Sequence, residues 1–324
     1  MTTLLLVSIT AIGLLALLYF AYPGWLFDRS IQMARRRAGI YRRQLTVNGW
    51  SWSYLDGGKA GAEPLVLIHG FGGDKDNWTR YAPFVTGHYR LIAPDLPGFG
   101  ENDRRLHEDY GIDAQVGRLT DFLDALGIDK CHLGGNSMGG FIALQFALRH
   151  PGRLRSLSLF NNAGVSGAVE SDLERIMAAD PSATPLAVRS MADIDRLLEL
   201  AAYRPRWIPR AFKRVMYRRF KTHEALLDRI FAQLLRRIEQ DGGTMNDQLD
   251  GIETPTLILW GRHDRLLNVS CTEVLHAGIK GSELVILEDA GHVPMIEQPA
   301  RTASAQLAFL TKHTGSLAVD LTDE

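Results

Sequence analysis

The stretch KCHLGGNSMGGFIALQFAL, residues 130–148, decides how the chain is interpreted. It joins a short apolar run typical of a strand to an apolar run typical of a helix, with glycines between them. In that junction Gly135, Ser137 and Gly139 fit the pattern G-x-S-x-G, which places a serine on a sharp turn with its hydroxyl clear of the sheet. Glycine is expected on both sides because a side chain there would collide with its neighbours. The stretch therefore predicts that Ser137 is a nucleophile.

Two phosphate-binding turns are also rich in glycine, and the sequence excludes both. A phosphate loop needs Lys after its last glycine, whereas Phe141 follows Gly140. The dinucleotide pattern G-x-G-x-x-G is absent at this turn and also after Gly70. We therefore expect no nucleotide cofactor, and serine chemistry needs no metal.

A serine is a weak nucleophile, so it needs a base and an acid that orients the base. His292 follows the last apolar strand, in EDAGHVPMIEQP, and Asp264 follows the strand before it, in WGRHDRLL. Both positions are carboxyl ends of predicted strands, at the same edge of the sheet as Ser137. The chain order Ser, Asp, His also matches one known arrangement of such residues. We therefore predict a catalytic triad of Ser137, Asp264 and His292.

Neighbouring residues offer weaker alternatives to this assignment. His263 lies beside the acid but is expected to point to the other side of a strand-like segment. Asp289 is only three residues from His292, and so short a loop rarely places an acid behind its own base. Asn161 and Asn162 follow RSLSLF, so this other strand end offers no acid.

The negative charge that develops on the substrate oxygen needs backbone N–H donors. Met138 directly follows the nucleophile, and Phe71 lies in HGFGG after the first long apolar run. The amides of these two residues are the predicted oxyanion hole. His69, in the same motif, is expected to have a structural role.

Short apolar runs alternate with helical patterns along most of the chain. This alternation predicts an α/β fold, with a mostly parallel sheet covered by helices on both faces. The predicted strands after an initial hairpin are Pro64–Gly70, Tyr89–Asp95, Lys130–Asn136, Arg155–Asn161, Pro255–Gly261 and Ser282–Glu288, and the helices include Asp113–Leu126, Phe141–Leu148 and Ala300–Leu310. Between them, residues 165–250 contain no strand-like run. We expect a core of residues 44–164 and 251–324 with a helical cap inserted at 165–250.

The amino terminus has the composition of a membrane anchor. Residues 1–27 carry no charge, and Leu4–Tyr22 is long enough as a helix to cross a bilayer core. A cleaved signal peptide is disfavoured because no basic residue precedes the run and no small-residue cleavage site follows it. Residues 28–43 then form a basic juxtamembrane segment with six arginines. These arginines favour a cytoplasmic catalytic domain.

The predicted cap contains a second basic stretch. Arg204–Lys221 has eight basic residues and no acid, interleaved with Trp207, Phe212 and Phe220. One interpretation is the solvated face of a cap helix, and another is a surface that rests on anionic lipid with its aromatic side chains inserted. The net charge of −1 and the lack of a nucleic-acid-binding motif argue against nucleic acid as a partner.

Two cysteines, Cys131 and Cys271, are too few for a disulfide scaffold and leave the compartment open. They could pair or stay free. The sequence also leaves the oligomeric state open between a monomer and a homodimer.

Five motifs together, LIHGFGGDKDNW, APDLPGFG, GGNSMGG, LILWGRHDRLL and DAGHVPMIEQP, resemble the α/β-hydrolase family over about residues 44–313. With the anchor added, the chain resembles membrane-anchored phospholipase A of the PlaF type and membrane monoacylglycerol lipases. The same motifs occur in soluble carbon–carbon hydrolases of ring-cleavage products. Relatives of the PlaF type face the periplasm, so the side of the membrane stays open.

The resemblance and the residues together predict a membrane-anchored serine hydrolase of lipid acyl esters, in the bacterial inner membrane. The enzymatic alternative is a carbon–carbon hydrolase. An alternative of another class is a non-catalytic receptor on a hydrolase fold, although such receptors often lack a triad residue.

Overall fold

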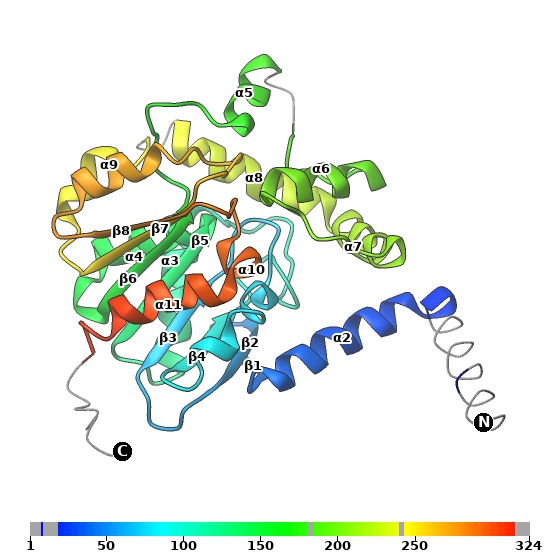
Figure 1. The fold of residues 1–324 in the computed structure, drawn as a ribbon, viewed down its shortest axis with the longest axis horizontal. Helices are drawn as coiled ribbons and strands as arrows, with labels where there is room; N and C mark the ends of the chain where they lie inside the picture. Colours follow the sequence, from blue (N-terminus) through cyan, green and yellow to red (C-terminus); the bar gives the residue numbers. More distant parts are fainter. Residues whose placement is uncertain (1–7, 9–18, 181–183, 240–242, 315–324) are drawn as a thin grey trace.

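The computed structural model describes residue 8 and residues 19–180, 184–239 and 243–314. Its centre is an eight-stranded sheet with the order β1-β2-β4-β3-β5-β6-β7-β8 (Figure 1). The strands are β1 Ile40–Val47, β2 Trp50–Gly58, β3 Pro64–Ile68, β4 Arg90–Pro94, β5 Cys131–Ser137, β6 Leu154–Asn162, β7 Thr256–Gly261 and β8 Glu283–Leu287. Strands β3 to β8 run parallel, and β1 and β2 form an antiparallel hairpin that joins β4. The mostly parallel sheet predicted from the sequence is thus confirmed, with strand bounds close to those expected.

Helices cover both faces of the sheet, as the alternation predicted. The core helices are α2 Pro23–Arg37, α3 Ile112–Ala125, α4 Met138–Arg149, α9 Cys271–Gly278, α10 Pro294–Glu297 and α11 Pro299–Leu310. Two apolar clusters fill the two sides: one includes α3, α4 and α9, and the other includes α10 and α11. Burial on both faces explains why the parallel strands are continuous apolar runs rather than alternating ones. The same clusters hold the strand ends that carry the site.

The hairpin begins earlier than the expected core boundary at residue 44. Asn48 and Gly49 both have positive φ, 48° and 78°, as a two-residue hairpin turn of type I′ requires. That turn fixes the register in which Ile40 faces Gly57. Gly39, with φ of 68°, lets the chain leave α2 and enter β1 at once. The last residues of the basic segment therefore belong to the sheet.

The insertion between β6 and β7 contains helices and connecting segments but no strand among its described residues. Its helices are α5 Asp172–Ala179, α6 Met191–Ala201, α7 Arg210–Thr222 and α8 Glu224–Glu239. Figure 1 shows α6, α7 and α8 together at one side of the sheet, with α2 beneath α7. Phe27 of α2 packs edge-on against Phe212 of α7, with ring centroids 5.3 Å apart. The cap is therefore in contact with the helix that follows the predicted anchor.

The predicted anchor itself, Leu4–Tyr22, lies outside the described residues except for Ser8 and residues 19–22. Within the described part of the chain, no helix is both long and apolar enough to cross a membrane. A break at Tyr22 precedes α2, whose first residue is Pro23. Proline suits this position because the first helical N–H needs no partner within the helix. The anchor therefore stays a prediction, and α2 is a separate helix after it.

Two details of the basic segments differ from the expectations. Arg35 is buried in α2, where it donates two hydrogen bonds to Asp76 of the core, so it does not face lipid. In the cap, Lys213, Arg219 and Lys221 form ion pairs with Asp195, Asp28 and Glu224. The eight basic residues are therefore not all uncompensated, because acidic side chains pair with three of them.

The aromatic residues of α7 also differ from the expectation that they insert into lipid. Phe212 packs on α2, and Phe220 lies against Gly72 of the core, where an added Cβ would be 3.3 Å from its ring. Both therefore face protein. Trp207, in the connector before α7, is 84% exposed.

Candidate active site

Ser137 stands at the junction of β5 and α4 in a backbone conformation that few residues adopt. Its φ is 55° and its ψ is −121°. A non-glycine residue held there costs about 1–3 kcal/mol, and such strain clusters at functional sites. Helix α4 begins at Met138, directly after the serine and earlier than the sequence pattern indicated. The amino end of the helix therefore lies beside the Ser137 backbone.

The flanking glycines are required by close backbone approaches, as predicted. A Cβ on Gly135 would lie 2.2 Å from the carbonyl oxygen of Gly139. A Cβ on Gly139 would lie 2.4 Å from the carbonyl oxygen of His69. Neither approach can be relieved by a side-chain rotation because both partners are backbone atoms.

Asp264 and His292 come together at the ends of β7 and β8. The Nδ1 atom of His292 lies 2.8 Å from Oδ2 of Asp264, and both side chains are buried. The other oxygen, Oδ1, accepts N–H bonds of 2.8 Å from Leu266 and 3.0 Å from Leu267. These bonds fix the carboxylate on one side, so its second oxygen can hold the imidazole in one orientation.

The neighbouring alternatives are placed elsewhere. Asp289 is more than half exposed, and its carboxylate is 3.6 Å from Arg301. His263 is exposed and stacks on Tyr203 of the cap, with ring centroids 3.7 Å apart. Neither side chain occupies the position between Asp264 and His292.

Asn161 is a site residue that the sequence argument missed. It is the last but one residue of β6 and has a φ of 45°, a conformation that Asn tolerates better than most residues. Its amide nitrogen donates to Oδ2 of Asp264 at 2.6 Å, and its oxygen accepts from the Gly261 N–H at 3.2 Å. The only sequence signal was an asparagine at a strand end otherwise suited to an acid. Asn161 therefore supports the acid instead of supplying one.

Ser137 and His292 lie on the same edge of the sheet and are linked through Asn136. The Asn136 side chain donates to the His292 carbonyl oxygen at 3.0 Å. Among the described residues, no hydrogen bond joins the Ser137 hydroxyl to His292. Hydrogen bonds between a nucleophile and its base are often long in a free enzyme and tighten when substrate binds.

Met138 and Phe71 are the predicted oxyanion donors: Met138 directly follows Ser137, and Phe71 follows Gly70, where an added Cβ would lie 2.9 Å from the Cβ of Ser137. Residues 70–73 form a turn in which the Gly73 N–H donates to the Gly70 carbonyl at 3.1 Å. Gly72 supplies the positive φ, 69°, that the third position of this turn requires. The turn bond does not use the Phe71 amide. Met138 is the first residue of α4, where N–H groups have no partner inside the helix.

His69 is fully buried, and both of its ring nitrogens have backbone partners. Nε2 accepts from the Leu96 N–H at 3.0 Å, so Nδ1 carries the proton and donates to the Gly70 carbonyl at 2.8 Å. Burial lowers the pKa of His69 to about 4, which keeps the ring neutral at physiological pH. His69 thus holds the Gly70 turn, in agreement with a structural role.

This geometry can be compared with known proteins. Residues 63–299 match the α/β-hydrolase fold family. The chain is an α/β hydrolase. It is similar to Lipase 3 of Moraxella sp. (strain TA144), with 34% identity over 285 residues that cover 87% of this chain and 88% of that lipase. It is also 29% identical to monoacylglycerol lipase abhd6-B of Xenopus laevis, covering 86% and 84% of the two chains.

A solved structure extends the similarity to nearly the whole chain. The crystal structure of a bacterial membrane phospholipase A aligns with this hydrolase at a TM-score of 0.86 and 36% identity. The alignment covers 98% of this chain and 100% of that one. The family resemblance seen in the five motifs is therefore confirmed.

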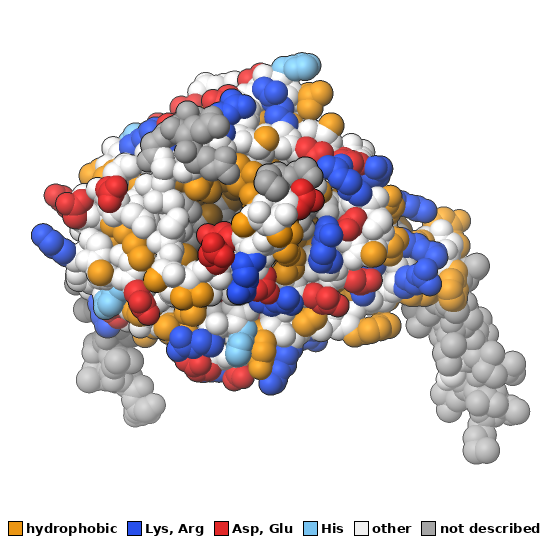
Figure 2. All heavy atoms as spheres, turned by 90° about the horizontal axis from the view of Figure 1, so that it is seen from above, with side chains coloured by type: hydrophobic (Ala, Val, Ile, Leu, Met, Phe, Trp, Pro, Cys, Tyr) orange, Lys and Arg blue, Asp and Glu red, His pale blue; other side chains and the backbone are white. Residues whose placement is uncertain are grey.

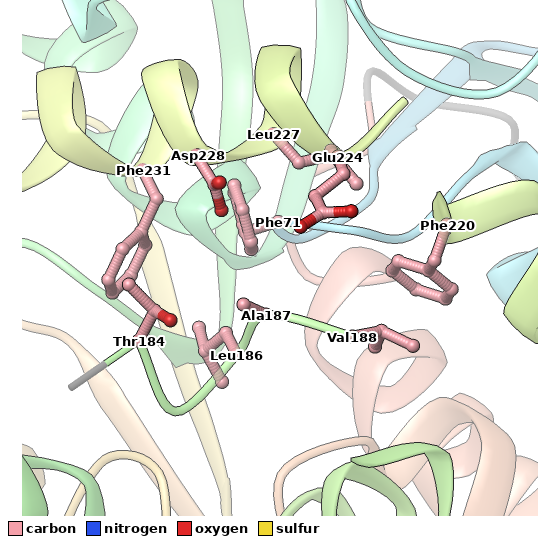
Figure 3. A pocket seen from close by; sticks show the side chains of 10 residues that line it. All are labelled: Phe71, Thr184, Leu186, Ala187, Val188, Phe220, Glu224, Leu227, Asp228 and Phe231. Carbon is pink, nitrogen blue, oxygen red and sulfur yellow. The ribbon is translucent and has the colours of Figure 1, made fainter. Parts of the chain in front are cut away.

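The cap of this α/β hydrolase places an apolar pocket against Phe71 (Figure 3). Phe71 lies between side chains of α8 and the segment that carries Leu186 and Val188. Phe231 of α8 packs on the Phe71 ring at 5.4 Å between centroids, and Phe220 closes another side. The pocket therefore borders the predicted oxyanion hole.

In this conformation the pocket is almost filled by its own side chains. The remaining cavity is about 10 Å³, roughly the space of one water. Arg189 forms ion pairs with Glu224 and with Asp228, the latter at 3.0 Å, and so ties the segment before α6 to α8. An acyl chain could enter only if these side chains move.

Substitution of Asn161 tests its support of the acid. We expect Asn161→Asp to lower kcat/KM on a short ester by about 10- to 100-fold, because a second carboxylate would repel Asp264 where an amide now donates. The change keeps the side-chain shape and a residue that tolerates positive φ. Steady-state kinetics measure the effect.

Asn268→Asp is the matched control, because its oxygen accepts the Ser270 N–H and aspartate does this equally well. Near-wild-type kcat/KM in Asn161→Asp would show that Asn161 does not act through Asp264.

Proposed function

We propose that this protein is a membrane-associated serine hydrolase that cleaves acyl esters of lipids. The observation that carries the proposal is the buried Asp264–His292 hydrogen bond at the strand edge where strained Ser137 stands. A structural histidine would not need a buried carboxylate that is itself held by Asn161. An ordinary turn would pack equally well at this position, so packing does not account for the strained backbone of Ser137.

In the proposed reaction, Ser137 Oγ attacks the ester carbonyl carbon while His292 takes the hydroxyl proton. The N–H groups of Met138 and Phe71 bind the oxyanion of the tetrahedral intermediate. When the intermediate collapses, His292 gives the proton to the leaving alcohol and an acyl-enzyme remains. Water then attacks the carbonyl carbon of the acyl-enzyme while His292 takes its proton. When this second intermediate collapses, His292 gives that proton to Ser137 Oγ, which leaves as the free hydroxyl, and the fatty acid is released.

The proposed chemistry uses only side chains and backbone amides of the chain. Within the described ranges, no group of three or more His, Cys, Asp or Glu side chains is arranged to hold a metal ion. Cys131 and Cys271 are free and buried, and burial raises their thiol pKa values to about 12 and about 11. Neither thiol competes with Ser137 as a nucleophile at neutral pH.

A lipid substrate is supported by the apolar pocket beside Phe71 and by the relatives, which are named lipases and a phospholipase A. Phospholipids, lysophospholipids and monoacylglycerols all present the same acyl ester to the serine. The test is release of fatty acid from each of these lipids, and of p-nitrophenol from short esters, by purified protein with Ser137→Ala as control.

Two outcomes would replace the proposal. Turnover of a ring-cleavage product without ester turnover would indicate a carbon–carbon hydrolase. Absence of Ser137 labelling by a fluorophosphonate would indicate a ligand receptor on a hydrolase fold.

We further propose that the apolar segment before α2 anchors the enzyme in a bilayer and that the cap rests on its surface. Trp25 and Trp207 are exposed, and Phe20 and Tyr22 precede α2 with exposed rings. Figure 2 shows basic and hydrophobic side chains together at the end of the molecule beside the amino-terminal segment. Aromatic and basic side chains in one surface are typical of contact with a membrane interface.

Deletion of residues 1–22 tests the anchor while keeping all of α2. We expect the truncated protein to move, at least in part, from membranes to the soluble fraction and to retain turnover of a short ester. Carbonate extraction should leave the full-length protein in the membrane. Full-length protein in the soluble fraction, or a mature amino terminus near Trp25, would contradict the anchor.

A further inference from the structure

Glu297 ends helix α10 and accepts three backbone hydrogen bonds with its carboxylate. Its Oε1 accepts from the N–H of Gly291 at 2.8 Å and from that of Val293 at 3.3 Å. These two residues flank His292. Its Oε2 accepts from the N–H of Tyr203 in the cap at 2.7 Å. Residues 291–293 are called the histidine loop below. The Glu297 side chain thus contacts both sides of this loop and also the connector that follows α6.

The histidine loop also contacts the cap directly. The His292 N–H donates to the carbonyl oxygen of Ala201 at 2.9 Å. Ala201 is the last residue of α6, where carbonyl groups have no partner within the helix. An added Cβ on Gly291 would lie 2.7 Å from the Tyr203 nitrogen, so loop and cap pack backbone against backbone.

The chemistry of the position requires a carboxylate. Each oxygen of Glu297 faces N–H donors, so an amide at this place could satisfy one side only. If the oxygen of a side-chain amide at residue 297 pointed toward Gly291, the NH₂ group of that amide would face the N–H of Tyr203. In the opposite orientation, the NH₂ group would face the N–H groups of Gly291 and Val293. Burial raises the pKa of Glu297, and the three N–H bonds favour its charged form.

We propose that Glu297 is a positioning residue that fixes His292 by joining the histidine loop to the cap at Tyr203. The inference rests on the proposed function, in which His292 is the base. Glu297 touches neither substrate nor the reacting atoms, and it acts through the backbone on both sides of His292. The cap is thereby part of the framework that orients the base, in addition to covering the site.

Glu297→Gln is the main test, assayed on a short soluble p-nitrophenyl ester. We expect kcat to fall about 10- to 100-fold while KM stays within about twofold, because small misplacement of a catalytic group costs rate rather than binding. The rate of fluorophosphonate labelling of Ser137 should fall by the same factor. In proton NMR, the downfield resonance of the proton between His292 and Asp264 should broaden or shift, which a packing role would not produce.

Three variants accompany the test. Glu288→Gln is the control for the same chemical change, since Glu288 pairs with Arg262 on the surface. Tyr203→Ala removes the ring that stacks on His263 but keeps the N–H to Glu297, and it should keep kcat within about threefold. Gly291→Ala disturbs the contact with Tyr203 without altering the carboxylate, and it should lower kcat as Glu297→Gln does.

The outcomes separate this inference from the proposed function. If Ser137→Ala abolishes turnover but Glu297→Gln keeps kcat within about threefold, the inference is wrong and the proposed function stands. If Ser137→Ala retains turnover, the proposed function fails and the inference falls with it. Should Glu297→Gln not fold, Gly291→Ala decides, and a wild-type kcat in that variant overturns the inference.

Discussion

Ser137→Ala, His292→Ala and Asp264→Asn are each expected to lower ester turnover by about 10⁴- to 10⁶-fold while the fold is retained. The first variant lacks the attacking oxygen, and the second lacks the group that takes its proton. In the third, an amide at residue 264 would be surrounded by donors on both sides. Oδ1 now accepts from Leu266, and Oδ2 accepts from Asn161 as well as contacting His292.

The acid variant is the most informative of the three because it separates two assignments. Asp289→Asn is the matched control, and we expect it to change turnover by no more than about twofold, because Asp289 is exposed and pairs with Arg301. Initial rates on a short ester, with circular dichroism to verify folding, measure both. Loss of activity in Asp289→Asn with retention in Asp264→Asn would reverse the assignment.

The parts of the site that the sequence predicted are those set by local pattern. Gly135 and Gly139 lie on either side of Ser137, and close backbone approaches leave no room for a side chain at either position. This steric requirement appears directly in the sequence as the pattern G-x-S-x-G. Asp264 and His292 follow apolar runs, and the ends of parallel strands meet at one edge. Order along the chain and position at strand ends were enough to nominate all three residues.

The parts that the sequence did not predict depend on contacts between distant segments. Asn161 was recognised as a non-acid, but its bond to Asp264 crosses 103 residues of sequence. Glu297 lies inside a quoted motif, yet its role depends on Tyr203, 94 residues away. A pattern of residue types carries the chemistry of each side chain but not the identity of its partner.

The basic residues of the cap are a second case in which the sequence does not identify the partners of charged side chains. The sequence placed eight basic residues in one stretch, and helix α7 distributes the six that it contains over different faces. Arg219 is turned toward Asp28 of α2, 191 residues away, and Lys213 toward Asp195. By contrast, Arg210, Arg214 and Arg218 recur every four residues and are exposed, with no acid partner among the described residues. These three form one face of α7 that is free to contact anionic lipid.

Reversal of that face, Arg210, Arg214 and Arg218 to Glu, is expected to lower activity on anionic vesicles by about a hundredfold or more at low salt. Each basic residue near an anionic surface contributes about 1 kcal/mol, so the loss of three amounts to roughly 3 kcal/mol before any repulsion from the new acids. Turnover of a short soluble ester should stay within about threefold, because the hydrogen bonds of Asp264 and His292 are not altered.

The matched control reverses Lys59, Lys130 and Lys280, which are exposed and have no ion pair among the described residues, and so gives the same change in net charge. If the α7 face contacts lipid, the control keeps vesicle activity, because charge far from the surface is screened beyond about 8–10 Å. Added salt should lower the vesicle activity of the wild type toward that of the α7 variant, because screening weakens the attraction to anionic lipid that the variant has already lost. Equal losses on vesicles and on the soluble ester would instead mean that the three arginines support the fold of the cap. Unchanged vesicle activity would mean that they form an ordinary solvated face.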